Sequence, residues 1–143
     1  MHSFTRASPA MLQTLELLSS VPSVGRTAAF TMLALLPELG CFAPRQVAAL
    51  VGAAPLNFES GKMRGQRNIH GGRAEVRTVL YAATLSGIRG NAVLEAFFEG
   101  LVRRGKAHKI ARSAAARKLL TWLNALVHQS KPWFPPIPDA APA

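Results

Sequence analysis

Apolar residues recur every three or four positions along most of this 143-residue sequence, which is the period of an α-helix with one buried face. Met11, Leu15 and Leu18 follow this spacing near the start of the chain. The pattern predicts helices at about 9–20, 26–36, 44–51, 73–86, 91–104 and 106–129. A chain of this length fits one domain, so we expect an all-α fold in a compact helical domain.

Proline, asparagine and glycine residues mark several expected helix ends. Pro44 fits the first turn of the third helix, where the N–H that proline lacks would have no partner. Asn91 is expected to cap the fifth helix, and the run Gly87–Gly90 is expected to break the helix before it.

The helical pattern stops between residues 52 and 72, where glycine, proline and asparagine are frequent. We expect a long basic Gly-rich loop there, and a loop of this length in a compact domain is usually functional or disordered. The chain therefore divides into an N-terminal extension at 1–10, a helical domain at 11–130 and a Pro-rich tail at 131–143.

Positive charge is abundant and unevenly placed. The 17 Lys and Arg residues outnumber the 7 Asp and Glu residues, for a formal net charge of +10, and most of them lie in clusters at 60–77 and 103–118. Such clusters bind nucleic-acid phosphates by releasing counterions, although a solvated basic surface is an alternative. The candidate nucleic-acid-binding residues are Lys62, Arg64, Arg67, Arg73, Arg77, Lys106, Lys109, Arg112, Arg117 and Lys118.

A membrane partner is not expected. No apolar run approaches the ~20 residues of a membrane span, and residues 1–6 lack the apolar core of a secretory signal. Neither basic cluster lies on a strongly amphipathic helix with large aromatic anchors. We therefore expect a cytoplasmic protein.

The segment between the first two helices, Val21-Pro22-Ser23-Val24-Gly25, has the outline of a helix-hairpin-helix-like unit. In such a unit, backbone N–H groups at a helix N-terminus contact a DNA phosphate, here those of Val24 and Gly25. These units usually carry a second glycine, and Ser23 occupies its place. A short helical hairpin that only packs is therefore the alternative.

The acidic residues are too few and too scattered for a metal-dependent nuclease site, and no histidines have metal-ligand spacing. We expect no metal or cofactor in this chain. Nucleophilic chemistry remains, and Ser60 is the best candidate because it precedes Gly61 in a strongly basic segment. An ordinary turn serine is the alternative. Core packing is expected for Cys41 and Trp122, and anchoring of the tail for Trp133.

Several ordered motifs resemble a known family. They are Ser60-Gly61-Lys62-Met63-Arg64-Gly65, Ile69-His70-Gly71-Gly72-Arg73, Val76-Arg77, Leu80-Tyr81, and Ala116-Arg117-Lys118-Leu119-Leu120. Over residues 12–133 the chain resembles the C-terminal transposase domain of one group of insertion sequences. These transposases have an N-terminal resolvase-like acidic domain, and a bridge RNA guides their recombination.

The resemblance implies that Ser60 is the nucleophile that joins covalently to DNA. We expect Lys62, Arg64, Arg67 and Arg73 near the scissile phosphate, with Arg77 next. It also implies partners: DNA, the guide RNA, and a Mg²⁺-binding acidic domain of the same or another subunit. A homo-oligomer is expected as well. We expect this chain to be a truncated or fragment transposase that is inactive alone. The alternative is a non-catalytic nucleic-acid-binding remnant.

Overall fold

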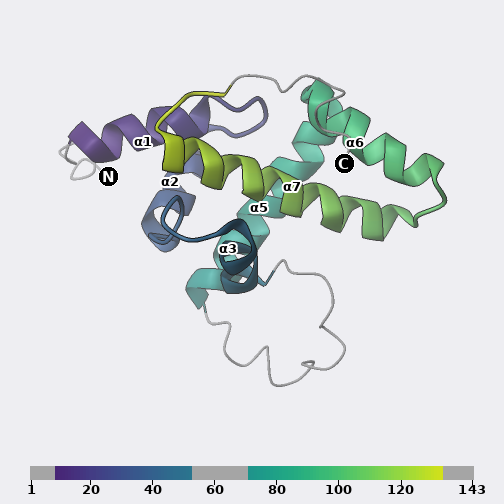
Figure 1. Cartoon of the computed structure of the whole chain (residues 1–143), viewed down its shortest axis with the longest axis horizontal. Coiled ribbons are helices and arrows are strands. Elements are labelled where there is room, and N and C mark those ends of the chain that lie inside the picture. The colour runs from purple at the N-terminus through teal and green to yellow at the C-terminus, as the bar shows by residue number, and fades with distance from the viewer. Residues whose placement is uncertain (1–8, 53–70, 134–143) are drawn as a thin grey trace.

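The computed structural model describes residues 9–52 and 71–133, with side chains from residue 74 onward in the second range (Figure 1). Within these ranges all regular secondary structure is α-helical, which confirms the predicted fold class. The helices are α1 (Pro9–Ser19), α2 (Arg26–Leu35), α3 (Pro44–Val51), α5 (Gly71–Gly90), α6 (Ala92–Arg103) and α7 (His108–Gln129).

Helix α7 organises the packing, because it contacts α1, α3, α5 and α6 (Figure 1). Helix α5 crosses it and also contacts α2, α3 and α6. Helices α1, α2, α3, α5 and α7 contribute fully buried side chains to one continuous core, which include Leu18, Met32, Val47, Val51, Leu80, Leu119 and Leu123. Leu94 of α6 is also fully buried. The second half of α7 contributes Leu119, Leu120, Leu123 and Leu126 to this core.

The turn between α1 and α2 is tight and internally bonded. Val24 N–H donates to the carbonyl of Val21 over 3.0 Å. Ser23 has φ +88°, a left-handed conformation that favours glycine. Its Oγ is buried and has no hydrogen-bond partner. Serine therefore occupies a position whose backbone suits the glycine that such hairpins usually carry.

Helix α5 does not break at Gly87–Gly90, so that prediction is wrong. The helix continues to Gly90, and Gly87 lies inside it. A Cβ on Gly87 would lie 2.7 Å from Leu94 Cδ2 and 2.9 Å from Ser23 Oγ. The glycine therefore permits close packing against α6 and the hairpin. Helix α5 also begins at Gly71, two residues before its predicted start.

Asn91 caps α6 as predicted. Its Oδ1 accepts from the N–H groups of Val93 and Leu94 over 3.1 and 3.2 Å. Its Nδ2 also donates to the carbonyl of Pro22 over 3.4 Å. This buried amide therefore joins the α5–α6 junction to the α1–α2 hairpin.

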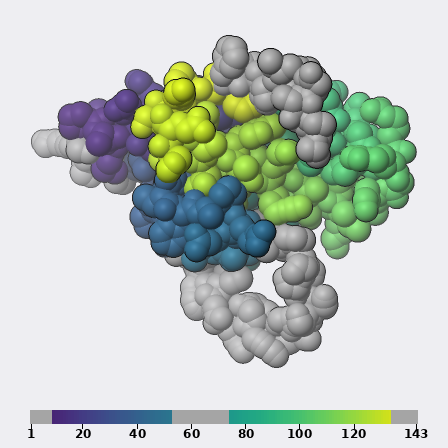
Figure 2. All heavy atoms as spheres, viewed as in Figure 1, coloured from purple at the N-terminus to yellow at the C-terminus, as the bar shows by residue number. Residues whose placement is uncertain are grey.

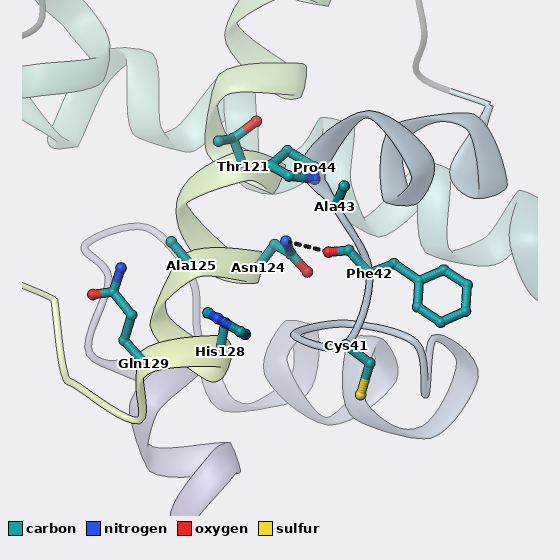
Figure 3. A pocket seen from close by; sticks show the side chains of 9 residues that line it. All are labelled: Cys41, Phe42, Ala43, Pro44, Thr121, Asn124, Ala125, His128 and Gln129. Atoms are coloured by element: carbon teal, nitrogen blue, oxygen red, sulfur yellow. Dashed lines mark hydrogen bonds between the residues drawn. The ribbon is translucent and has the colours of Figure 1, made fainter.

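The connection from α2 to α3 is fastened to α7 by the buried side chain of Asn124 (Figure 3). Asn124 Oδ1 accepts from Gly40 N–H over 2.6 Å, and its Nδ2 donates to Phe42 O over 3.1 Å. His128 Nδ1 lies 3.1 Å from Gly40 O. Gly40 has φ +87°, and a Cβ there would overlap the Val127 side chain.

Cys41 is exposed, so its predicted core packing is wrong. Leu36 and Leu39 fill the core from this connection, and Cys41 follows them in the turn that Asn124 holds. Pro44 opens α3 as predicted, and the Ala43 N–H before it donates to Gln46 Oε1 over 3.0 Å.

The chain after α7 turns back toward α1. Trp133 packs on Trp122 with ring centroids 4.8 Å apart, and the Trp133 backbone N–H donates to Ser20 Oγ over 2.8 Å. These two contacts hold Trp133 on the domain, as predicted for the start of the tail. Trp122 is half-buried at the edge of the core. Among the described helices, none is long and apolar enough to cross a membrane.

Candidate nucleic-acid interface

The turn between α6 and α7 carries exposed cations. We call this region the α6–α7 tip and define it as residues 103–110. Lys106 and Lys109 are exposed here, as are Arg103 and Arg104. Neither the tip nor α7 contains an acidic residue. Phosphates approaching the tip therefore meet no carboxylate in it.

Three other cations of the second cluster are half-buried on α7: Arg112, Arg117 and Lys118. The Lys118 ammonium lies 4.9 Å from the centre of the Phe97 ring, in a cation–π contact that joins α7 to α6. Lys118 therefore has a packing partner of its own. Figure 2 shows α7 crossing one face of the molecule, from the α6 end toward the end near α1.

Arg77 is half-buried, and its Nη1 donates to the carbonyl of Val51 over 3.0 Å. Val51 is the last residue of α3, and its carbonyl is one of those that a helix end leaves without an intrahelical partner. At least one of the five guanidinium N–H donors of Arg77 therefore bonds the fold itself. Arg73 lies in the first turn of α5.

Ser60, Lys62, Arg64 and Arg67 lie outside the described residues. The helices on either side of this segment, α3 and α5, contact each other.

The hairpin presents one helix end to solvent. Ala29 makes the first α2 bond to Gly25 O over 2.9 Å, so the N–H groups before Ala29 have no helical partner. Gly25 is exposed, has no side chain to cap this end, and has open space where a Cβ would be. The Val24 N–H already bonds Val21, which leaves Gly25 and the first turn of α2 as the available donors.

An open groove of about 350 Å³ adjoins this helix end, between α2 and α5. Its lining side chains are small or hydroxyl-bearing: Ser23, Gly25, Thr27, Ala28, Val79, Ala82, Ala83 and Ser86. Small side chains allow a ligand backbone to approach closely.

Sequence reasoning missed Arg26 as a candidate. It is the first residue of α2 and is exposed beside Gly25. Its charge lies next to the uncapped N–H groups, where a phosphate would be attracted by both. The signal available in the sequence was a basic residue directly after the hairpin glycine.

A second hollow, of about 330 Å³, lies between residues 41–44 and the last turns of α7. Asn124 lines this hollow, and its side-chain amide hydrogen-bonds the backbone of the α2–α3 connection (Figure 3). No three His, Cys, Asp or Glu side chains within residues 9–52 and 71–133 are placed to hold a metal ion. These residues therefore do not fit a Mg²⁺ site.

The described residues define a strongly basic helical domain with a cationic tip and an exposed helix end. A sequence comparison identifies the family of this domain: the model of the transposase IS116/IS110/IS902 family matches residues 15–99. This match covers more than half of the chain, so the chain belongs to that transposase family, whose substrate is DNA. A comparison with curated proteins gave no match.

Proposed function

We propose that this chain is the nucleophile-bearing, nucleic-acid-binding part of a transposase that recombines DNA through a serine, and that Ser60 is the nucleophile. The observation that carries the proposal is the family match, because residues 15–99 include Ser60 and the first basic cluster. The resemblance of the Ser60-Gly61-Lys62 motif to the family's serine motif assigns the role within that range.

In the proposed step, the Ser60 Oγ attacks a phosphorus atom of the DNA backbone. A new O–P bond forms, the serine hydroxyl loses its proton, and one P–O bond to a deoxyribose breaks. The departing strand end takes up a proton and leaves as a free hydroxyl. The phosphoserine ester conserves the bond energy for rejoining. Lys62, Arg64, Arg67 and Arg73 are proposed to stabilise the charge on the phosphate under attack.

The described scaffold supports this arrangement. The Arg77–Val51 hydrogen bond holds the end of α3 against α5, and these helices flank the segment that carries Ser60.

Two surfaces are proposed to hold nucleic acid away from the reacting phosphate. One is the second basic cluster, with Lys106, Lys109, Arg112, Arg117 and Lys118. The other is the hairpin, where Gly25 and the first turn of α2 supply backbone donors and Arg26 supplies charge. Contacts of both kinds go to phosphates, so they position the nucleic acid without reading its sequence.

Three partners complete the proposal. A guide RNA supplies the sequence specificity that phosphate contacts lack. A resolvase-like acidic domain, of the same or another subunit, supplies the Mg²⁺ site that the described residues do not fit. Association of several copies places two nucleophiles on the two DNA partners. The chain by itself is proposed to bind DNA and RNA without cutting them.

A covalent-trapping assay tests the nucleophile. The chain is combined with the acidic domain supplied in trans, guide RNA, end-labelled DNA and Mg²⁺, and the products are separated under denaturing conditions. We expect a protease-sensitive protein–DNA adduct with the wild type and none with Ser60→Ala. Thr14→Ala, which removes a hydroxyl bonded only to the Ala10 carbonyl on α1, is the control and should form the adduct normally.

An adduct that persists in Ser60→Ala would place the nucleophile elsewhere. Absence of any adduct, with salt-sensitive binding intact in all three proteins, would favour the non-catalytic remnant. Cleavage by the chain without the acidic domain would contradict the proposed division of labour.

A further inference from the structure

We propose that Ile110, at the α6–α7 tip, is an apolar wedge that inserts between base pairs of duplex DNA and kinks it. This proposal rests on the DNA binding proposed above and adds a mechanical role to it. Ile110 and the cations of the tip lie outside the match to the transposase family, which ends at residue 99.

The first observation is the exposure of Ile110. Its exposed fraction is 57%, the highest among the exposed large hydrophobic residues of the described ranges. Helix α7 buries Ala111, Ala115 and Leu119 on one face, and the helical rotation of about 100° per residue places Ile110 on the opposite face. The side chain therefore extends from the domain into solvent.

The second observation is the charge around it. A single exposed apolar residue is ordinary on a protein surface and needs no function. Ile110 is different because Lys106 and Lys109 are exposed beside it in the sequence, with Arg103 and Arg104 also exposed in the same tip. Cations that grip phosphates on both sides of an inserted aliphatic side chain are the combination that bends DNA from the minor groove.

The third observation is the firmness and narrowness of the tip. The Lys106 N–H donates to Leu101 O over 3.1 Å and the Gly105 N–H to Val102 O over 3.0 Å, so the turn is hydrogen-bonded. The Phe98 and His108 rings, 5.9 Å apart, pack across it. Gly105 has open space where a side chain would be. The hydrogen-bonded turn and the ring contact give Ile110 the fixed support that insertion between base pairs requires.

The chemistry of the side chain favours duplex DNA as the partner. Proteins that bind single strands stack the bases on aromatic rings. Phe97 and Phe98 are half-buried, the exposed His108 ring packs on Phe98, and the exposed apolar group of the tip is aliphatic. An aliphatic side chain offers no stacking platform, but it fills the gap between two unstacked base pairs.

The experiment measures binding and bending separately, with the full chain and a duplex that carries a fluorophore at each end. Wild type should bind the duplex and bend it by roughly 20–90°, which raises energy transfer. Ile110→Ala should lose most of this rise and weaken binding about threefold to tenfold, because apolar burial is lost. Ile110→Leu should retain the bend. Leu85→Ala, at a residue 47% exposed on α5, is the matched control and should behave as wild type.

A second probe reports the insertion itself. A 2-aminopurine base in the duplex should fluoresce more when wild type is added and should not respond to Ile110→Ala, since unstacking relieves its quenching. Salt-sensitive binding with an equal bend in Ile110→Ala would overturn the wedge and leave the proposed function standing. Failure of wild type to bind any duplex would overturn both. Binding without a bend would overturn the wedge alone.

Discussion

The Arg77 guanidinium donates to the Val51 carbonyl over 3.0 Å and so joins the first turns of α5 to the last residue of α3. A cation at a helix C-terminus also interacts favourably with the helix dipole. The residue that sequence analysis assigned to nucleic acid therefore has a structural contact of its own. Its two roles are separable by experiment.

Arg77→Ala should lower the free energy of unfolding by about 1–2 kcal/mol, because the Val51 carbonyl loses a charged donor. Urea denaturation followed by circular dichroism measures this change. The neighbouring Thr78→Ala, which removes an exposed hydroxyl bonded to Ala74 O, is the control and should change stability by less than about 0.5 kcal/mol. Equal stability of Arg77→Ala and wild type would assign Arg77 to ligand binding alone.

Ser23→Gly should stabilise the domain by about 1 kcal/mol. The substitution relieves the left-handed backbone at φ +88° and removes a buried hydroxyl that has no partner. The greater freedom of glycine in the unfolded chain offsets part of the gain. Ser130→Gly relieves a similar backbone, at φ +56°, where the serine is exposed, so its gain should be smaller. Thermal unfolding ranks the two, and a destabilised Ser23→Gly would mean that the hydroxyl is satisfied in solution.

Gly87→Ala and Gly100→Ala should change stability in opposite directions, although both glycines lie inside helices. A Cβ at Gly87 would overlap Leu94 and approach Ser23, whereas one at Gly100 meets nothing within 4 Å. We expect Gly87→Ala to cost about 1–3 kcal/mol by overpacking and Gly100→Ala to gain up to about 1 kcal/mol from helix propensity. Chemical denaturation of both variants in parallel provides the comparison. A stabilised Gly87→Ala would show that α5 and α6 separate easily.

Asn124→Ala should destabilise the domain by about 2–4 kcal/mol. The change leaves the Gly40 N–H and the Phe42 carbonyl without their side-chain partner, and it opens space beside the core. Gln129→Ala, one turn later and exposed, is the matched control and should stay within about 0.5 kcal/mol of wild type. Denaturant midpoints distinguish the pair. A loss below 1 kcal/mol for Asn124→Ala would mean that water replaces both bonds.

Lys109→Ala combined with Arg112→Ala should weaken binding to unrelated DNA sequences by similar factors. It should also make the dependence of log K on log salt shallower by about one to two units, because up to two phosphate contacts are lost. Fluorescence anisotropy over a salt series measures both effects. Arg89→Ala, an exposed cation outside both clusters, should leave the slope unchanged. Loss of affinity for one sequence only would contradict a phosphate contact.

Local signals in the sequence were sufficient for most of the fold. The apolar period located the described helices, and Asn91 and Pro44 marked two helix starts correctly because a cap and a first-turn proline act within a few residues. The predicted helix break at Gly87 was wrong because the role of this glycine is to pack against Ser23 and Leu94, and Ser23 is distant in sequence. The predicted burial of Cys41 was wrong because it rested on residue type alone. The turn that Asn124 holds places Cys41 at the surface.

The candidate site was less predictable. Sequence located the cations of the second cluster, but it could not separate the exposed Lys109 from Lys118, whose ammonium packs on Phe97. That difference arises only when α6 folds against α7. Ser60 and its basic neighbours lie outside the described residues, so their roles stay predictions.

The place of α7 in the chain has a consequence for synthesis on the ribosome. This helix comes last among those described, yet α1, α3, α5 and α6 all pack on it. Until residues 108–129 leave the exit tunnel, the apolar surface of the earlier helices that α7 covers stays exposed. Chains grow at roughly 5–20 residues per second, so those faces stay open for seconds. Every nascent copy therefore passes through an interval in which chaperones, or neighbouring nascent chains, compete with its own final helix.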